Sequence, residues 1–311
     1  MTKLLNYSRR EFTRVASSLL SLSLLPSIAS KAEISPGLLA KPIPKSNEYL
    51  PVIGMGTWIT FNVGNSQQLR AQRTQVLDTF FSMGGKIVDS SPMCGSAEEV
   101  VGNCLLKTGS EKLFSATKTW TSSTQEGIKQ FKDSQDLWGV ERFELLQIHN
   151  LVNWRGHLKM LRNLKDQNKI KYIGITTSHG RRHSEVEHIL KNEDIDFLQL
   201  TYNIVDREAE AKLLPLALEK GVAVIANRPF QGGGLPKLTR NMTLPDVAKE
   251  LGCYSWPQLL LNYSVSHPAI TCAIPATSKV SHMQENMHTL TGQLASAEQR
   301  DEILMTYLRQ S

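Results

Sequence analysis

Three ionisable side chains, Asp89, Lys118 and His149, each come at the end of a short apolar run. A carboxylate and an ammonium brought together form an ion pair that can lower the pKa of an adjacent acid, and a histidine can orient or polarise a carbonyl group. Each residue taken singly is more often structural, because the ends of strands are commonly polar. Their joint position after three successive runs predicts one site for acid–base chemistry on a carbonyl.

Eight such runs, apolar or β-branched, recur along the chain, and amphipathic stretches with a helical period separate most of them. The runs lie at 52–56, 86–89, 113–117, 145–149, 172–176, 197–202, 223–227 and 271–274. The stretches lie at 69–81, 97–106, 124–137, 156–164, 184–190 and 209–218. Strand and helix in alternation imply parallel pairing with right-handed crossovers. The pattern predicts an α/β fold, a (β/α)8 TIM barrel, whose strand exits would bring the three residues to one face.

An open doubly wound sheet is the structural alternative. That fold predicts a glycine-rich GxGxxG turn after the first strand, where a dinucleotide binds. Gly54-Met55-Gly56 is followed by Thr57 and Trp58, so this turn is missing and the closed barrel is favoured.

The chain has 311 residues, of which 41% are hydrophobic, enough for one large core and one domain at 51–311. Its net charge is +6. Much of the excess lies in residues 1–32, where Lys3, Arg9, Arg10, Arg14 and Lys31 face Glu11 alone, which leaves +2 for residues 33–311. This balance gives no indication of nucleic-acid binding.

Residues 1–32 resemble an export signal. Arg9 and Arg10 follow Ser8 and precede a Leu- and Ser-rich stretch at 15–28, the pattern of a twin-arginine signal peptide. The stretch is too short and too rich in serine for a comfortable membrane span, although an uncleaved anchor is the alternative. We therefore expect the twin-arginine export machinery as a partner, a periplasmic or other extracytoplasmic location, and no stable span in the mature chain. Residues 33–50 are rich in proline and predict an extended lead.

A metal site is not indicated by the cysteines or histidines. The four cysteines form no CxxC pair and no Cys/His cluster, and their spacing selects no disulfide. His179 and His183 flank two arginines in the segment 178–183, which we interpret as a solvated basic turn.

Several motifs, in order, resemble those of the aldo-keto reductase family over residues 51–290. They are Gly54–Trp58, Val88–Gly102, Thr117–Lys118, Gln147–His149, Tyr172–Thr176, Gln199–Asn203 and Ile274–Lys279, with Glu285-Asn286 beyond. The resemblance implies a barrel that binds NADPH without a Rossmann domain. It also implies reduction of small aldehydes or ketones by an Asp, Tyr, Lys and His tetrad.

Asp89, Lys118 and His149 match three members of that tetrad, but Cys94 stands where the family has its tyrosine. The tyrosine protonates the carbonyl oxygen, and a cysteine sulfur lies several bonds nearer the backbone. Loss of a positioned proton donor costs about 10²–10⁴ in rate, so we expect reduced activity. One alternative is a catalytically depleted barrel that binds cofactor or another ligand. Another is a reactive Cys94 thiolate stabilised by Lys118 and a protonated His149.

The resemblance also implies a cofactor site for NADP. It assigns Thr176, Thr177 and Gln199 to the nicotinamide carboxamide, and it places Asn227 where many relatives stack a tyrosine on the ring. It assigns the phosphates to Thr277, Ser278 and Lys279 and the adenine to Asn286. His282 stands where relatives often have an arginine that binds the 2′-phosphate, and this replacement weakens the preference for NADP over NAD. The segment 230–234 is either a loop over the cofactor or a plain connection, and Trp58 and Trp120 either line the mouth or pack in the core.

Overall fold

The computed structural model describes residues 37–311. The predicted signal peptide at 1–32 and the first part of the lead lie outside the described residues.

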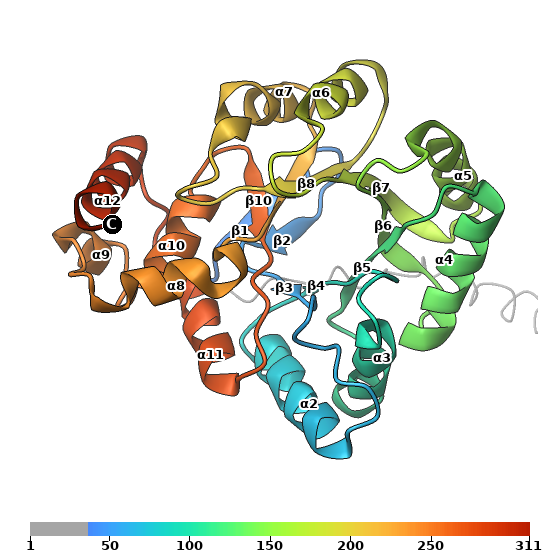
Figure 1. Ribbon diagram of the computed structural model, residues 1–311, viewed down its shortest axis with the longest axis horizontal. Coiled ribbons are helices and arrows are strands. Elements are labelled where there is room, and N and C mark those ends of the chain that lie inside the picture. The colour runs from blue at the N-terminus through green and yellow to red at the C-terminus, as the bar shows by residue number, and fades with distance from the viewer. Residues whose placement is uncertain (1–36) are drawn as a thin grey trace, which may run out of the picture. The chain divides into compact units, whose positions relative to one another are not determined.

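Eight parallel strands form the barrel, and Figure 1 shows helices around them. They pair in chain order: β3 (Met55–Gly56), β4 (Ile87–Asp89), β5 (Phe114–Thr119), β6 (Phe143–His149), β7 (Ile170–Thr176), β8 (Phe197–Thr201), β9 (Ala223–Asn227) and β10 (Ile270–Ala273). Isolated parallel bridges from Ile53 to Ala273 and from Gly56 to Ala276 link the first and last strands. The predicted barrel is confirmed, with a strand at or beside each of the eight runs.

The α-helices of the described residues are α2 (Gln67–Ser82), α3 (Ala97–Thr108), α4 (Thr124–Trp138), α5 (Trp154–Asp166), α6 (His183–Asn192), α7 (Leu213–Glu219), α8 (Gly234–Leu238), α9 (Asp246–Glu250), α10 (Trp256–Val265), α11 (Val280–His288) and α12 (Ala297–Gln310). Helices α2 to α7 lie at or beside the six predicted stretches, and α8 to α12 lie beyond them in the chain. Serine hydroxyls cap the N-termini of α2, α4, α10 and α12 by accepting a backbone N–H.

The sequence analysis missed α10, which lies between β9 and β10 in the chain. Apart from Pro257, every residue of this helix is buried, polar ones such as Asn262 included. A helix covered on all sides carries no amphipathic period, so its type is hidden from pattern analysis.

The described part of the lead forms a hairpin. Strands β1 (Ala40–Pro42) and β2 (Tyr49–Pro51) pair antiparallel, where the sequence predicted only an extended connection. Ile43 and Leu50 are buried in the same cluster as inward-facing strand residues such as Phe197. The Lys41 ammonium donates to the carbonyls of Val265, His267 and Ile270, at 2.6–2.9 Å. Proline is tolerated here because an edge strand leaves one row of N–H groups unused.

Candidate active site

A buried ion pair joins two neighbouring strands at the carboxyl end of the barrel. Asp89 ends β4 and Lys118 lies near the end of β5, and each is only 5% exposed. The Lys118 ammonium lies 2.5 Å from Asp89 Oδ2 and donates to the Ser90 carbonyl at 2.8 Å. The register of the two strands brings these residues together, as we expected from their positions at strand exits.

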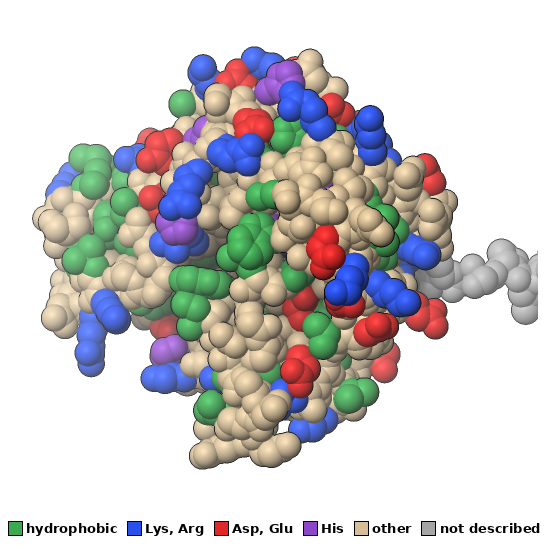
Figure 2. Space-filling model, turned by 45° about the vertical axis from the view of Figure 1, so that its right-hand side comes forward, with side chains coloured by type: hydrophobic (Ala, Val, Ile, Leu, Met, Phe, Trp, Pro, Cys, Tyr) green, Lys and Arg blue, Asp and Glu red, His purple; other side chains and the backbone are tan. Residues whose placement is uncertain are grey.

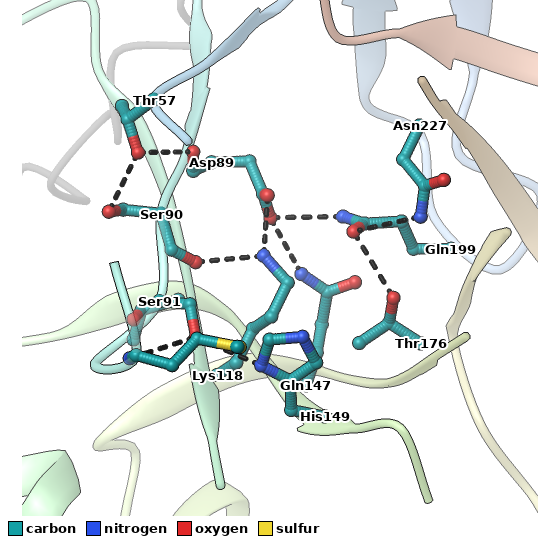
Figure 3. A network of polar contacts seen from close by, with 12 residues as sticks. Thr57, Asp89, Ser90, Ser91, Lys118, Gln147, His149, Thr176, Gln199 and Asn227 are labelled. Carbon is teal, nitrogen blue, oxygen red and sulfur yellow. Dashed lines mark hydrogen bonds and ion pairs between the residues drawn. The ribbon is translucent and has the colours of Figure 1, made fainter. Parts of the chain in front are cut away.

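Two glutamines complete the surroundings of the carboxylate. Gln147 and Gln199 donate to Asp89 Oδ1 at 2.8 and 3.0 Å, and Figure 3 shows both amides directed toward it. Gln147 was not predicted as a site residue. It stands two positions before His149 in β6, and residues two apart on a strand face the same side. The signal available in the sequence was a single glutamine inside an apolar run.

His149 lies beside this network as a neutral ring. Its Nδ1 atom lies 3.0 Å from the Ser91 hydroxyl, a residue that the sequence analysis did not single out although it follows Asp89 by two positions. Burial, with a smaller effect from the Lys118 charge, lowers the pKa of His149 to about 3. A neutral imidazole at physiological pH can orient or polarise a carbonyl by a hydrogen bond, but it holds no extra proton to give.

Cys94 is half-buried and its thiol stays protonated. Its N–H donates to the Ser91 carbonyl at 2.9 Å, in the turn that leads from β4 to α3. Burial, with the Asp89 and Glu98 charges, raises the pKa of Cys94 to about 11 despite the opposing Lys118 charge. This direction opposes the thiolate interpretation, because loss of hydration outweighs the Lys118 charge, and the lowered pKa of His149 removes the second cation that could have assisted.

One cavity of about 380 Å³ opens beside these groups. Asp89, Cys94, Lys118 and His149 all line it, together with Trp58 and Met93. Trp58 is 51% exposed and lies at the mouth rather than in the core. Trp120 is 43% exposed and does not line the cavity, although its ring centroid is 6.3 Å from that of His149.

The residues assigned to the nicotinamide occupy the next strands. Gln199 and Asn227 line the cavity, whereas Thr176 and Thr177 are buried and do not line it. The Thr176 hydroxyl donates to Gln199 Oε1 at 3.2 Å, and Asn227 Nδ2 donates to the Thr177 carbonyl at 2.9 Å. The Thr177 hydroxyl is buried with no hydrogen-bond partner among residues 37–311.

The residues assigned to the phosphates and adenine do not line the cavity. They follow its lining residue Ala276 in the chain. Lys279 is exposed and caps α11, and His282 is exposed in the first turn of that helix. The Thr277 hydroxyl accepts the Lys279 N–H at 3.2 Å, and the Ser278 carbonyl accepts from the Arg73 guanidinium at 3.2 Å. Asn286 is buried, on the next turns of α11.

The glycine-rich segment 230–234 connects β9 to α8. It contains a short 3-10 turn at Gln231–Gly233 whose backbone is not helical at Gly232. Gly232 and Gly233 have φ of 68° and 93°, the left-handed region that favours glycine. Phe230 and Gly232 line the cavity, which places this turn at its edge.

A sequence model of the aldo/keto reductase family matches residues 52–303. The chain belongs to this family. It is 28% identical over 262 residues to methylglyoxal reductase YeaE of Escherichia coli, covering 80% of this chain and 88% of the relative. It is 32% identical over 239 residues to pyridoxine 4-dehydrogenase of the same organism, covering 68% and 79%.

Solved structures of aldo/keto reductases share the fold. A reductase from Klebsiella pneumoniae, crystallised with NADP and acetate, matches with a TM-score of 0.72 and 22% identity, over 84% of this chain and 92% of the other. Glycerol dehydrogenase from Gluconobacter oxydans matches with a TM-score of 0.72 and 18% identity, over 87% and 95%.

The basic turn of this aldo/keto reductase is exposed at His179, Arg181 and Arg182. His179 and Arg181 line the cavity, whereas Arg182 pairs with Glu185 and donates to the Asn150 carbonyl. The interpretation of 178–183 as a solvated basic turn is therefore confirmed for His179, Arg181 and Arg182, and the structure adds that the first two border the cavity. Within residues 37–311, no three His, Cys, Asp or Glu side chains are grouped so that they could hold a metal ion. No helix in the same range is long and apolar enough to cross a membrane.

Proposed function

We propose that this aldo/keto reductase is an NADP(H)-dependent oxidoreductase that reduces small aldehydes or ketones, with activity limited by Cys94. The observation that carries the proposal is a cavity that Asp89, Lys118 and His149 line together at the carboxyl end of the barrel. Relatives named for reduction of methylglyoxal support a small carbonyl substrate.

The residues present fit a nicotinamide cofactor. The amides of Gln199 and Asn227 line the cavity and offer the kinds of donor and acceptor that a carboxamide needs, and the Thr177 hydroxyl next to them in the fold is buried without a partner among the described residues. Lys279 and His282 are both exposed, so they are free to meet phosphate groups. Structural neighbours crystallised with NADP or NADPH support the same choice. NADPH, when bound, supplies hydride to the carbonyl carbon.

The side chains around the cavity would then prepare the carbonyl. The neutral His149 ring would donate a hydrogen bond to the carbonyl oxygen, and the Ser91 hydroxyl would hold the ring in place. Lys118, fixed by Asp89, adds positive charge beside the oxygen on which negative charge develops. The Cys94 sulfur lies too near the backbone to replace the phenol, so water would supply the proton slowly.

Binding of NADPH is the first test of this function. We expect NADPH to quench the intrinsic fluorescence, because Trp58 lies at the mouth of the cavity. Lys279→Ala should weaken NADPH binding about tenfold, since one charge-assisted contact to phosphate would be lost. NADH titrated into the same variant separates the two kinds of phosphate: an equal loss would place Lys279 at the pyrophosphate, and a smaller loss would place it at the 2′-phosphate. Failure of NADPH to bind the wild-type protein would contradict the proposed function.

A catalytically depleted, cofactor-binding barrel is the second candidate, and the cysteine at position 94 is the observation that favours it. This candidate predicts tight binding of NADPH without its consumption in the presence of any small aldehyde, methylglyoxal included. Measurable consumption above a Lys118→Met variant would exclude it.

We further propose that residues 1–32 direct export through the twin-arginine pathway, after which the mature chain works outside the cytoplasm. The support is the Arg9-Arg10 pair followed by the Leu- and Ser-rich stretch. Replacing both arginines by lysine should retain the full-length chain in the cytoplasmic fraction of its host. Equal fractionation of the wild type and the Arg9→Lys/Arg10→Lys variant would contradict this proposal.

A further inference from the structure

Two loops place three basic side chains on the wall of the cavity. His179 and Arg181 lie in the loop after β7, and Arg228 follows the last residue of β9. We call these three residues the basic rim. Figure 2 shows Lys, Arg and His side chains gathered beside hydrophobic ones on the upper left of one face of the molecule.

The arginines of the basic rim have no direct carboxylate partner among the described residues, although the Asp206 charge acts on His179. Besides Arg181 and Arg228, the charged residues that line the cavity are Asp89 and Lys118, and these two neutralise one another. Neither rim arginine forms an ion pair with a carboxylate of the described residues. Two guanidinium groups without an ion pair therefore border the cavity that Asp89 and Lys118 also line.

The members of the basic rim are close enough to act together. Burial and then the charges of Arg228 and Arg181 lower the pKa of His179, while the Asp206 charge opposes them, and both arginines line the same cavity as this imidazole. Arg228 also has a left-handed backbone with φ of 53°, which is unfavourable for a residue with a side chain. Its carbonyl accepts from Asn203 Nδ2 at 3.0 Å, which holds the residue in that conformation. Backbone strain of this kind concentrates at functional sites.

We propose that the basic rim binds an anionic group on the carbonyl substrate, with Arg181 as the main contact. The substrate would be an aldehyde or ketone that carries a carboxylate or phosphate at some distance from its carbonyl. Guanidinium groups bind both anions through paired hydrogen bonds. Trp58, Met93 and Phe230, which also line the cavity, would contact the carbon chain in between. The proposal rests on the proposed reductase function and adds the substrate class.

A phosphate of the cofactor is the other possible source of the anion. Arg228 directly follows Asn227, which the proposed function places beside the nicotinamide, so a cofactor phosphate could reach Arg228. Arg181 comes from a different loop, two strands earlier in the barrel order. The test therefore has to separate Arg181 from Arg228 and to be done with and without the cofactor.

Calorimetric titration of an unreactive ligand pair provides the test. The ligands are 4-(hydroxymethyl)benzoate and its neutral analogue of the same shape, 4-nitrobenzyl alcohol, each titrated into the mature protein alone and with saturating NADPH. Both are alcohols, so no hydride transfer occurs with the reduced cofactor. We expect the carboxylate to bind at least about tenfold more tightly than the nitro compound, and we expect added salt to reduce the ratio.

Neighbouring arginines provide matched variants. Arg181→Ala should abolish the preference for the carboxylate, whereas Arg182→Ala should keep it, because Arg182 is engaged with Glu185 outside the cavity. Arg228→Ala should reduce the preference in part. Equal binding of the two ligands by the wild-type protein, or equal losses in Arg181→Ala and Arg182→Ala, would overturn the proposal. A preference that disappears when NADPH is present would assign the basic rim to the cofactor instead, which also overturns it.

The proposed reductase function is tested by measurements that do not depend on the basic rim. Its readouts are NADPH binding and the reduction of a neutral aldehyde, 4-nitrobenzaldehyde, neither of which requires Arg181. A protein that passes those two measurements but shows no preference for the carboxylate keeps the reductase function and loses the anionic substrate class.

Discussion

Replacing Cys94 by tyrosine should raise the rate of NADPH consumption with small aldehydes at least about tenfold, because a positioned general acid contributes about 10²–10⁴. Cys94 lines the cavity with Lys118 and His149, so a longer side chain at this position would point its hydroxyl toward the same space. The Lys118 charge would favour release of the phenol proton to the carbonyl oxygen. His149, neutral at physiological pH, would remain a hydrogen-bonding partner.

The matched control is Cys94→Phe, which adds the same ring without the hydroxyl. If the phenol acts as the proton donor, Cys94→Phe should be no faster than the wild type, while NADPH affinity stays similar in both variants. A gain of equal size in the two variants would assign the effect to packing of the ring. An unchanged rate in a correctly folded Cys94→Tyr protein would contradict our account of this position.

Replacing Lys118 by methionine should lower the free energy of unfolding by about 3–5 kcal/mol, the usual cost of leaving one member of a buried ion pair alone. Asp89 is 5% exposed, and its remaining partners would be the neutral amides of Gln147 and Gln199. Those amides cannot compensate a full charge away from water. Urea denaturation at neutral pH measures the loss.

The double variant Asp89→Asn/Lys118→Met should regain much of the lost stability, because it removes the isolated charge as well. Lys191→Met is the surface control, since Lys191 pairs with Glu187 one helical turn away and is 54% exposed. Such a pair contributes about 0.3–0.5 kcal/mol. A Lys118→Met protein as stable as Lys191→Met would mean that the Asp89 charge is relieved in another way, by protonation or by water.

The strands were predictable because their signal is local. Each central strand is buried on both faces, and such strands have nearly continuous apolar sequences. The same approach failed for α10, because apolar residues occur on every side of this helix and leave no amphipathic period. It also failed for the hairpin at 40–51, because prolines in this segment gave no sign of strand pairing. In both cases the deciding interactions come from residues distant in the chain.

The residues of the site also fall into those that the sequence could predict and those that it could not. That Asp89, Lys118 and His149 end successive strands is visible along the chain, and the barrel topology then brings them to one rim. The partners of Asp89 were harder to predict from the sequence. Gln147 donates to this carboxylate only because its position on the strand turns its side chain inward.

The amino-acid sequence by itself determined the order of strands and helices, the family motifs, and the absence of a tyrosine at position 94, since each of these is a pattern of neighbours along the chain. Only the tertiary structure decided that the Cys94 thiol and the His149 ring are uncharged, and that Arg181 reaches the cavity while Arg182 does not. The physical reason is that ionisation depends on burial and on charges brought close by folding, and these belong to residues far apart in the chain.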